Sequence, residues 1–213
     1  MDKSKLVITI ERQYGSGGRI VGKKLAEELN IPFYDDEILS MTAEKSAVGE
    51  KYFRLADEKA GNNLLRKIVG NLRFPAGIFE EPKTEGDVTS PDNLFRFQSE
   101  VIRKLAAEED CIIMGRCADY VLEGMEGLVR VFIYADMDFR EKRTIEKEYY
   151  AAKDAKKNIK RIDRERRDYF RYYTGKEWEF PENYDLMINT AAIGTDGAVE
   201  TIKNYLKVRG FEI

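Results

Sequence analysis

A glycine-rich segment near the start of the chain has the composition of a phosphate-binding loop. Residues 6–10 are apolar, the stretch RQYGSGGR follows at residues 12–19, and a helical pattern begins directly after it. Backbone N–H groups in such a turn bind anions, and the partial positive charge of the helix start adds to this. The segment offers glycines, a hydroxyl and a charge for this purpose: Gly15, Gly17, Gly18, Ser16 and Arg19. The alternative is an ordinary tight turn between a strand and a helix.

The loop fits neither of the two common nucleotide-binding patterns. In the mononucleotide pattern G-x-x-x-x-G-K-[ST], aligning the second glycine with Gly17 places Arg12 at the first glycine and Gly18 at the lysine. In the dinucleotide pattern G-x-G-x-x-G, starting at Gly15, the third glycine falls on Ile20. The loop therefore indicates phosphate binding and leaves both folds open.

The composition excludes several kinds of chemistry. The 213 residues include 36 Lys and Arg, 39 Asp and Glu, two cysteines and no histidine, for a net charge of -3. Histidine general bases, histidine-bound zinc and disulfide frameworks are thereby excluded. Cys111 and Cys117 are expected to be reduced structural thiols. No targeting segment or membrane-spanning run is visible, so we expect a cytoplasmic protein without a membrane partner and with nucleic acid an improbable ligand.

Apolar runs alternate with helical patterns along the chain. This alternation predicts an α/β fold with a parallel sheet. The strands are expected at 6–10, 31–35, 111–115, 129–135 and 185–189, and the helices at 18–29, 93–109 and 195–208. Residues 74–91 are expected to be a loop, and so are residues 191–194.

Two stretches interrupt this alternation within what is expected to be a single domain, residues 1–213. The core comprises 1–39, 93–137 and 181–213, with an insert at 40–92 and a charged helical arm at 138–180. Within the arm, residues 153–171 contain nine basic and four acidic residues, a local charge of +5. On a helical wheel Arg164 and Arg167 share the basic face, whereas Arg166 points away from it.

Three segments resemble the cytidylate kinase-like family, a branch of the P-loop nucleoside monophosphate kinases. They are residues 8–39 (ITIERQYGSGGRIVGKKLAEELNIPFYDDEIL), residues 93–122 with the Gly-Arg pair at 115–116, and residues 160–190. The resemblance implies a three-layer P-loop kinase fold with a five-stranded parallel sheet, in which residues 40–92 are a helical acceptor-site insert and residues 138–180 a helical lid. It also implies transfer of the γ-phosphoryl group of ATP, with Mg²⁺, to CMP or another small acceptor.

The resemblance, together with the chemistry of the residues themselves, gives candidate residues for each part of this site. For the ATP phosphates they are Gly15, Ser16, Gly17, Gly18, Arg19 and Arg12, with Arg19 as the first substitute for the missing lysine and Ser16 as a weak metal ligand. For the acceptor they are Asp35, Arg116, Asp119 and Gln98. For the lid they are Asp163, Arg164, Arg166 and Arg167, and the arginines at 164 and 167 are favoured because they share the basic face. The residues expected to be catalytic are Arg19, Arg164, Arg167 and Asp35.

Three other functions remain open on the sequence. Gly18 at the lysine position favours a nucleotide-binding regulatory protein without catalysis. The basic arm would suit an RNA-binding protein, whose affinity would fall steeply with salt. Asp35, twenty residues after Gly15, could bind a ribose in a dinucleotide-dependent oxidoreductase.

Overall fold

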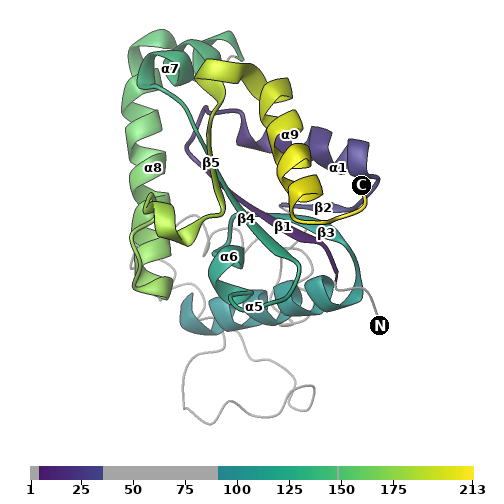
Figure 1. Cartoon of the computed structure of the whole chain (residues 1–213). Coiled ribbons are helices and arrows are strands. Elements are labelled where there is room, and N and C mark those ends of the chain that lie inside the picture. The colour runs from purple at the N-terminus through teal and green to yellow at the C-terminus, as the bar shows by residue number, and fades with distance from the viewer. Residues whose placement is uncertain (1–4, 36–90, 148) are drawn as a thin grey trace. The chain divides into compact units, whose positions relative to one another are not determined.

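A computed structural model describes residues 5–35, 91–147 and 149–213 of the chain (Figure 1). The chain divides into two compact units, one formed by residues 1–34 and 105–213 and the other by residues 35–104. The strands are β1 (Val7–Arg12), β2 (Phe33–Tyr34), β3 (Cys111–Met114), β4 (Leu128–Tyr134) and β5 (Leu186–Asn189). The helices are α1 (Gly18–Leu29), α5 (Pro91–Glu108), α6 (Ala118–Val121), α7 (Met137–Glu146), α8 (Ala152–Thr174), η1 (Pro181–Asn183) and α9 (Thr190–Val208).

The five strands form one parallel sheet in the order β2-β3-β1-β4-β5. In its middle, Ile8 of β1 pairs with Ile112 of β3 on one side and with Val129 of β4 on the other. The predicted α/β fold with a five-stranded parallel sheet is therefore confirmed. The expected insert at 40–92 lies almost entirely outside the described residues, and so does the loop expected at 74–91 except for Pro91, which begins α5.

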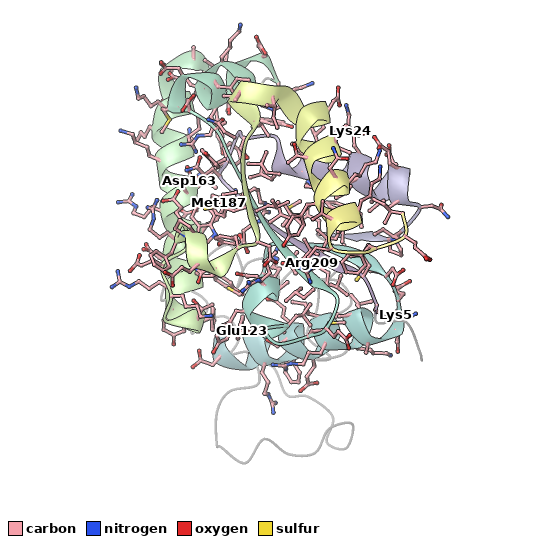
Figure 2. The ribbon with its side chains drawn as sticks, in the orientation of Figure 1. Lys5, Lys24, Glu123, Asp163, Met187 and Arg209 are labelled. Carbon is pink, nitrogen blue, oxygen red and sulfur yellow. The ribbon has the colours of Figure 1, made fainter. Side chains whose placement is uncertain are left out.

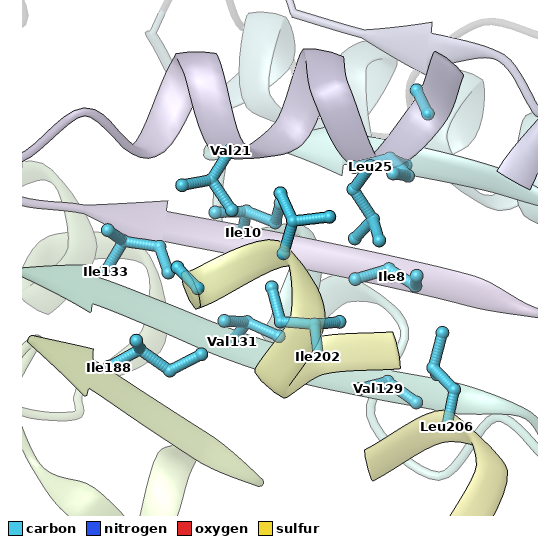
Figure 3. Close-up of a cluster of buried hydrophobic side chains, with 14 of the residues drawn as sticks. Ile8, Ile10, Val21, Leu25, Val129, Val131, Ile133, Ile188, Ile202 and Leu206 are labelled. Atoms are coloured by element: carbon cyan, nitrogen blue, oxygen red, sulfur yellow. The ribbon is translucent and has the colours of Figure 1, made fainter. Parts of the chain in front are cut away.

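One face of the sheet is covered by α1 and α9. Because successive strand side chains point to opposite faces, Ile8 and Ile10 of β1 share this face with Val129, Val131 and Ile133 of β4. They pack against the apolar stripes of the two helices (Figure 3). The helical residues in this cluster are Val21, Leu25, Ala26, Ala198, Val199, Ile202 and Leu206. A face of apolar strand residues covered by helices is typical of a parallel sheet.

The opposite face is more polar and packs against the segment that follows α8. Phe132 of β4 contacts the rings of Trp178 and Tyr184, with ring centroids 5.2 and 4.9 Å apart. Glu11 of β1 lies on this face too, and its Oε2 accepts a hydrogen bond of 3.0 Å from Trp178 Nε1. Trp178 is therefore an anchor that holds the end of the arm against the sheet.

The arm predicted at 138–180 is helical, as expected, and consists mainly of α7 and α8. Ala155, Ile159 and Phe170 form the buried side of α8, and its exposed side is rich in Lys and Arg. This is the amphipathic pattern that the sequence predicts. None of the helices in the described part of the chain is long and apolar enough to cross a membrane.

The prediction of a loop at residues 191–194 is wrong. The chain becomes helical directly after β5, because the Asn189 side chain accepts a hydrogen bond of 2.9 Å from the Ala191 N–H and so caps α9. Gly194, with φ of 71° and ψ of 177°, then kinks the helix. The kink explains why the sequence pattern locates the helix start only at residue 195.

Candidate functional site

The glycine-rich loop connects the central strand β1 to α1 and presents backbone N–H groups. Gly15 and Gly17 have φ of 79° and 88°, the left-handed conformation that glycine adopts without strain. The backbone N–H groups of Gly15, Gly17 and Gly18 have no acceptor among the residues that the structure describes. Unpaired N–H groups at the start of a helix make a binding site for an anion such as phosphate.

Other segments pack closely against this loop. A Cβ at Gly15 would lie 2.9 Å from Thr144 Oγ1 and 3.0 Å from the Arg140 carbonyl oxygen, both in α7. At the carboxyl end of β5, the Thr190 hydroxyl donates to the Ser16 carbonyl at 2.6 Å. The loop is thus held by elements on the β4 and β5 side of the sheet, and larger residues at the glycine positions would push these elements away.

A buried ion pair joins α7, α8 and the loop. Asp163 of α8 pairs with Arg140 of α7, and the two side chains are only 9% and 6% exposed (Asp163 is labelled in Figure 2). The Asp163 carboxylate accepts a hydrogen bond of 2.7 Å from the Tyr14 N–H, and Arg140 donates to the Tyr14 carbonyl at 3.3 Å. Within the lid, Asp163 is expected to pin one of the neighbouring lid arginines or to touch the nucleotide. In the structure it pairs instead with Arg140 of α7 and fixes the loop backbone, and a contact with a nucleotide stays a prediction.

A second set of contacts ties the base of the loop to the arm. Arg166 donates to the Arg12 carbonyl at 2.8 Å, and its guanidinium lies 5.6 Å from the ring centre of Tyr14. Gln13 donates to Glu179 at 2.8 Å, and Glu179 also pairs with Arg167 at 3.0 Å. Through these contacts α8 helps to hold the loop in place.

The preference for Arg164 and Arg167 over Arg166 is therefore not reflected in the structure. Arg164 is exposed and makes no ion pair or hydrogen bond with any described residue, and Arg167 is engaged by Glu179. The helical wheel ranked these arginines by their common basic face, but that face points to solvent. Arg166, which lies off that face, contacts the loop instead.

Arg143 of α7 is a candidate that the sequence did not single out. A Cβ at Gly17 would lie 3.3 Å from the Arg143 Cζ and from its Nη2, so the guanidinium lies directly against the loop. The half-buried Arg143 side chain forms no ion pair or hydrogen bond within the described ranges. Its charge is available to a bound phosphate. The spacing of Arg140 and Arg143 by one helical turn after β4 was the available signal.

The predicted loop residues Arg19 and Ser16 occupy different environments. Arg19, in the first turn of α1, is exposed. Ser16 is fully buried, and its hydroxyl donates to the Gln13 carbonyl at 2.8 Å. This inward hydrogen bond gives Ser16 the role of shaping the turn and argues against its predicted role as a metal ligand.

No group of three or more acidic or cysteine residues in the described ranges is arranged to hold a metal. Arg19 stands where mononucleotide-binding loops have a hydroxyl. The loop therefore has no hydroxyl at the usual metal position.

The turn after β3 carries the predicted Gly-Arg motif. Gly115, Arg116 and Cys117 have φ of 70°, 62° and 54°, three left-handed residues in succession. Non-glycine residues rarely adopt this conformation, and such backbone strain is concentrated at functional sites. The turn places Arg116 at the carboxyl end of β3, the strand next to β1, where open α/β sheets bind ligands.

Asp119, three residues further on, is buried rather than presented at the surface. Burial, and then the neighbouring Glu11 carboxylate, raises its pKa to about 8. Within the described part of the chain its Oδ1 has no hydrogen-bond partner. At 4% exposure, Asp119 is poorly placed for the predicted contact with a soluble acceptor. Burial also raises the pKa of both cysteine thiols, which fits the structural role expected for them.

The remaining acceptor candidates, Asp35 and Gln98, belong to the unit formed by residues 35–104. Asp35 directly follows β2, Gln98 lies on α5, and both are buried, with 5% and 2% exposure. A buried polar side chain needs an interaction partner, and each of the two residues has one. Their roles toward an acceptor stay predictions.

Comparisons with known proteins agree with this geometry. The pattern that defines the cytidylate kinase-like family matches residues 7–192. An uncharacterised protein from Eubacterium ventriosum ATCC 27560 is similar in structure, with a TM-score of 0.68 and 28% identity over 95% of this chain and 99% of that one. No curated protein matches the sequence.

Shikimate kinases share the fold at lower identity. The enzyme from Bacteroides thetaiotaomicron has a TM-score of 0.53 and 13% identity, over 95% of this chain and 98% of its own. The enzyme from Acinetobacter baumannii, solved in complex with shikimate, has the same TM-score and identity over 98% and 97%. At such identities the likeness establishes the fold, that of the P-loop kinases.

The loop, the parallel sheet and the family match together define a kinase-like protein of P-loop fold. The chain belongs to the cytidylate kinase-like family.

Proposed function

We propose that this protein is an ATP-dependent phosphotransferase that moves the γ-phosphoryl group of ATP to a small acceptor. The observation that carries the proposal is the loop between β1 and α1. There the N–H groups of Gly15, Gly17 and Gly18 have no acceptor among the described residues, and the Arg143 guanidinium lies against Gly17. Backbone donors and a nearby arginine suit the phosphate chain of a nucleoside triphosphate.

Phosphoryl transfer depends mainly on positioning and on neutralising charge. An acceptor oxygen forms a bond to the γ-phosphorus while the bond from that phosphorus to the β–γ bridging oxygen breaks, and ADP leaves with the electron pair. Histidine and a covalent enzyme intermediate are not needed. In this proposal the loop holds the phosphates, Arg143 neutralises their charge, and the Asp163–Arg140 pair keeps the loop in its binding conformation.

Arg116 is the residue we propose for the acceptor side. It lies at the end of β3, and an arginine can bind two oxygens of a phosphate at once. A phosphorylated acceptor such as CMP suits this charge, and the family resemblance favours the same class. Asp35 is proposed to position the acceptor. Magnesium accompanying ATP would supply further charge neutralisation, and no step is assigned to it here.

Turnover tests this proposal directly. Purified protein is incubated with ATP, Mg²⁺ and one acceptor at a time from a panel of CMP, other nucleoside monophosphates and shikimate, and ADP is measured. We expect ADP formation with at least one acceptor of the panel, and we expect CMP to be the best. ADP release at the buffer background with every acceptor would refute the proposed catalysis.

A nucleotide-binding protein without catalysis is the second candidate. Two observations favour it: Gly18 stands at the lysine position, and Arg19 stands where mononucleotide-binding loops have a hydroxyl. This candidate predicts ATP binding comparable to that of an active kinase together with background turnover. The same incubation, combined with an ATP titration, separates the two functions.

A further inference from the structure

Two departures from the mononucleotide pattern occur at residues that touch each other. The pattern has a glycine at the end of the strand and a lysine at the start of the helix, whereas this chain has Arg12 and Gly18 at those positions. A Cβ at Gly18 would lie 2.6 Å from Arg12 Cβ and 3.1 Å from Arg12 Cγ. A side chain at position 18 would overlap the Arg12 side chain, so only one of the two positions can carry a large residue.

The Arg12 side chain lies against two glycines, Gly18 and Gly115, where a larger residue would overlap it. Beyond Gly18 it extends to the turn after β3, where its Nη1 lies so close to Gly115 that a Cβ there would overlap it. The Arg12 side chain therefore runs from the helix start of the loop, which its Cβ and Cγ approach, to the turn that carries Arg116, where its guanidinium lies against Gly115. Both places are at the carboxyl ends of the neighbouring strands β1 and β3.

The backbone from which this side chain starts is fixed. The Arg12 carbonyl accepts the hydrogen bond of 2.8 Å from Arg166, and the following residue, Gln13, donates its N–H to the Ile133 carbonyl at 3.0 Å. The peptide group that joins Arg12 to Gln13 is thus held through both its carbonyl and its N–H, which limits where the side chain can go. Arg19, by contrast, is exposed on α1.

We propose that Arg12 supplies the positive charge that phosphate loops take from lysine. In this chain the glycine and the charged residue of the pattern have exchanged places, so that the charge is at position 12 and the glycine at position 18. The charge then reaches the phosphates from the strand and not from the helix, and it lies on the side of the loop that faces Arg116. A guanidinium in this place can bind two phosphate oxygens, so it suits the γ-phosphoryl group between donor and acceptor. The inference rests on the proposed function, because it assumes that the loop binds ATP.

The exchange predicts a specific pattern of ATP affinities, measured by isothermal titration on the full chain. Arg12→Gly is expected to weaken binding by about 10- to 100-fold, the usual range for losing a hydrogen bond to a charged group. Adding Gly18→Lys to this variant restores the mononucleotide pattern and is expected to recover at least about tenfold of the loss. The ATP affinity of Arg19→Ala is expected to stay within about threefold of wild type. The same is expected of Arg209→Ala, the matched control at an exposed arginine directly after α9.

A second readout does not depend on ATP. Gly18→Ala is expected to lower the melting temperature of the wild-type chain, because its Cβ meets Arg12, and to lower it much less when Arg12 is replaced by glycine. Equal losses in the two backgrounds would overturn the spatial part of the proposal.

The results distinguish failure of the exchange from failure of the proposed function. Wild-type protein that binds ATP, with Arg12→Gly equal to it or Arg19→Ala far weaker, would overturn the exchange and leave the function standing. Wild-type protein without saturable ATP binding would overturn both. If the melting temperature of Arg12→Gly is strongly lowered, Arg12→Lys is tested in its place. A well-folded Arg12→Lys variant is expected to bind ATP with intermediate affinity, and complete loss of ATP binding would count against a role for charge at this position.

Discussion

The buried pair of Asp163 and Arg140 gives the most quantitative prediction for the role of α8. Asp163→Asn keeps the shape of the side chain and an oxygen that can still accept from the Tyr14 N–H. It removes the charge opposite Arg140, whose side chain is only 6% exposed. The variant therefore leaves a buried guanidinium without its counter-ion.

The expected loss follows from that burial. Removing one partner of a buried ion pair costs about 3–5 kcal/mol of unfolding free energy. For a chain of this size, each kcal/mol lowers the melting temperature by about 2–4 °C, so the expected shift is roughly 6–20 °C. Removing both charges, in Asp163→Asn with Arg140→Gln, should recover a large part of the loss because no unpaired charge remains.

Urea and thermal unfolding measure this loss. Trp178, the sole tryptophan of the chain, packs on Phe132 of the sheet and reports on the unfolding of this region by its fluorescence. Glu165→Ala is the matched control on the same helix. Its pair with Arg161 is about half exposed, and such a pair contributes only about 0.3–0.5 kcal/mol. A loss in Asp163→Asn no larger than in the control would refute the view that α8 clamps the loop.

Two further predictions concern the buried acid and the loop glycines. Because the pKa of Asp119 rises from 3.8 to about 8 in the folded state, folding is favoured at low pH, and the stability that the group contributes is lost as pH rises between those values, by at most about 1.4 kcal/mol per pH unit. Asp119→Asn should flatten this fall between pH 5 and pH 9 in thermal melts relative to wild type, and parallel curves would count against the assignment. Gly15→Ala should lower the free energy of unfolding by about 1–3 kcal/mol through overpacking against α7. This loss comes in addition to the cost of a left-handed backbone, which Gly210→Ala shares although nothing lies within 4 Å of Gly210. Equal melting temperatures in the two alanine variants would contradict the close packing of the loop.

The sequence predicted the local elements of the site because they follow from local patterns. Short apolar runs are sufficient to indicate buried parallel strands, and the glycines after β1 are sufficient to indicate a phosphate loop. The Gly-Arg motif at residue 115 was located in the same way, at the end of β3. Helix α1 begins and ends at the expected residues, 18 and 29.

The contacts that assemble the site could not be predicted because they join distant segments. Arg140 and Asp163 are 23 residues apart, and their common contact with Tyr14 depends on how α7 and α8 pack. Arg143 reaches Gly17 for the same reason. The helical wheel favoured Arg164 because it records the direction of a side chain from its own helix axis and not what lies there. Likewise, only the contact with Arg12 explains why position 18 is a glycine.

An ATP titration tests the central claim, that the loop binds the phosphates of a nucleoside triphosphate, most directly. Isothermal titration compares wild type with Arg143→Ala and with Lys142→Ala, the exposed neighbour on α7 whose side chain is 78% exposed. We predict saturable binding to wild type, unchanged binding to the Lys142 variant, and binding about 10- to 100-fold weaker to the Arg143 variant at an unchanged melting temperature. Absence of saturable binding to the folded wild-type protein, or equal affinity in all three, would contradict the claim.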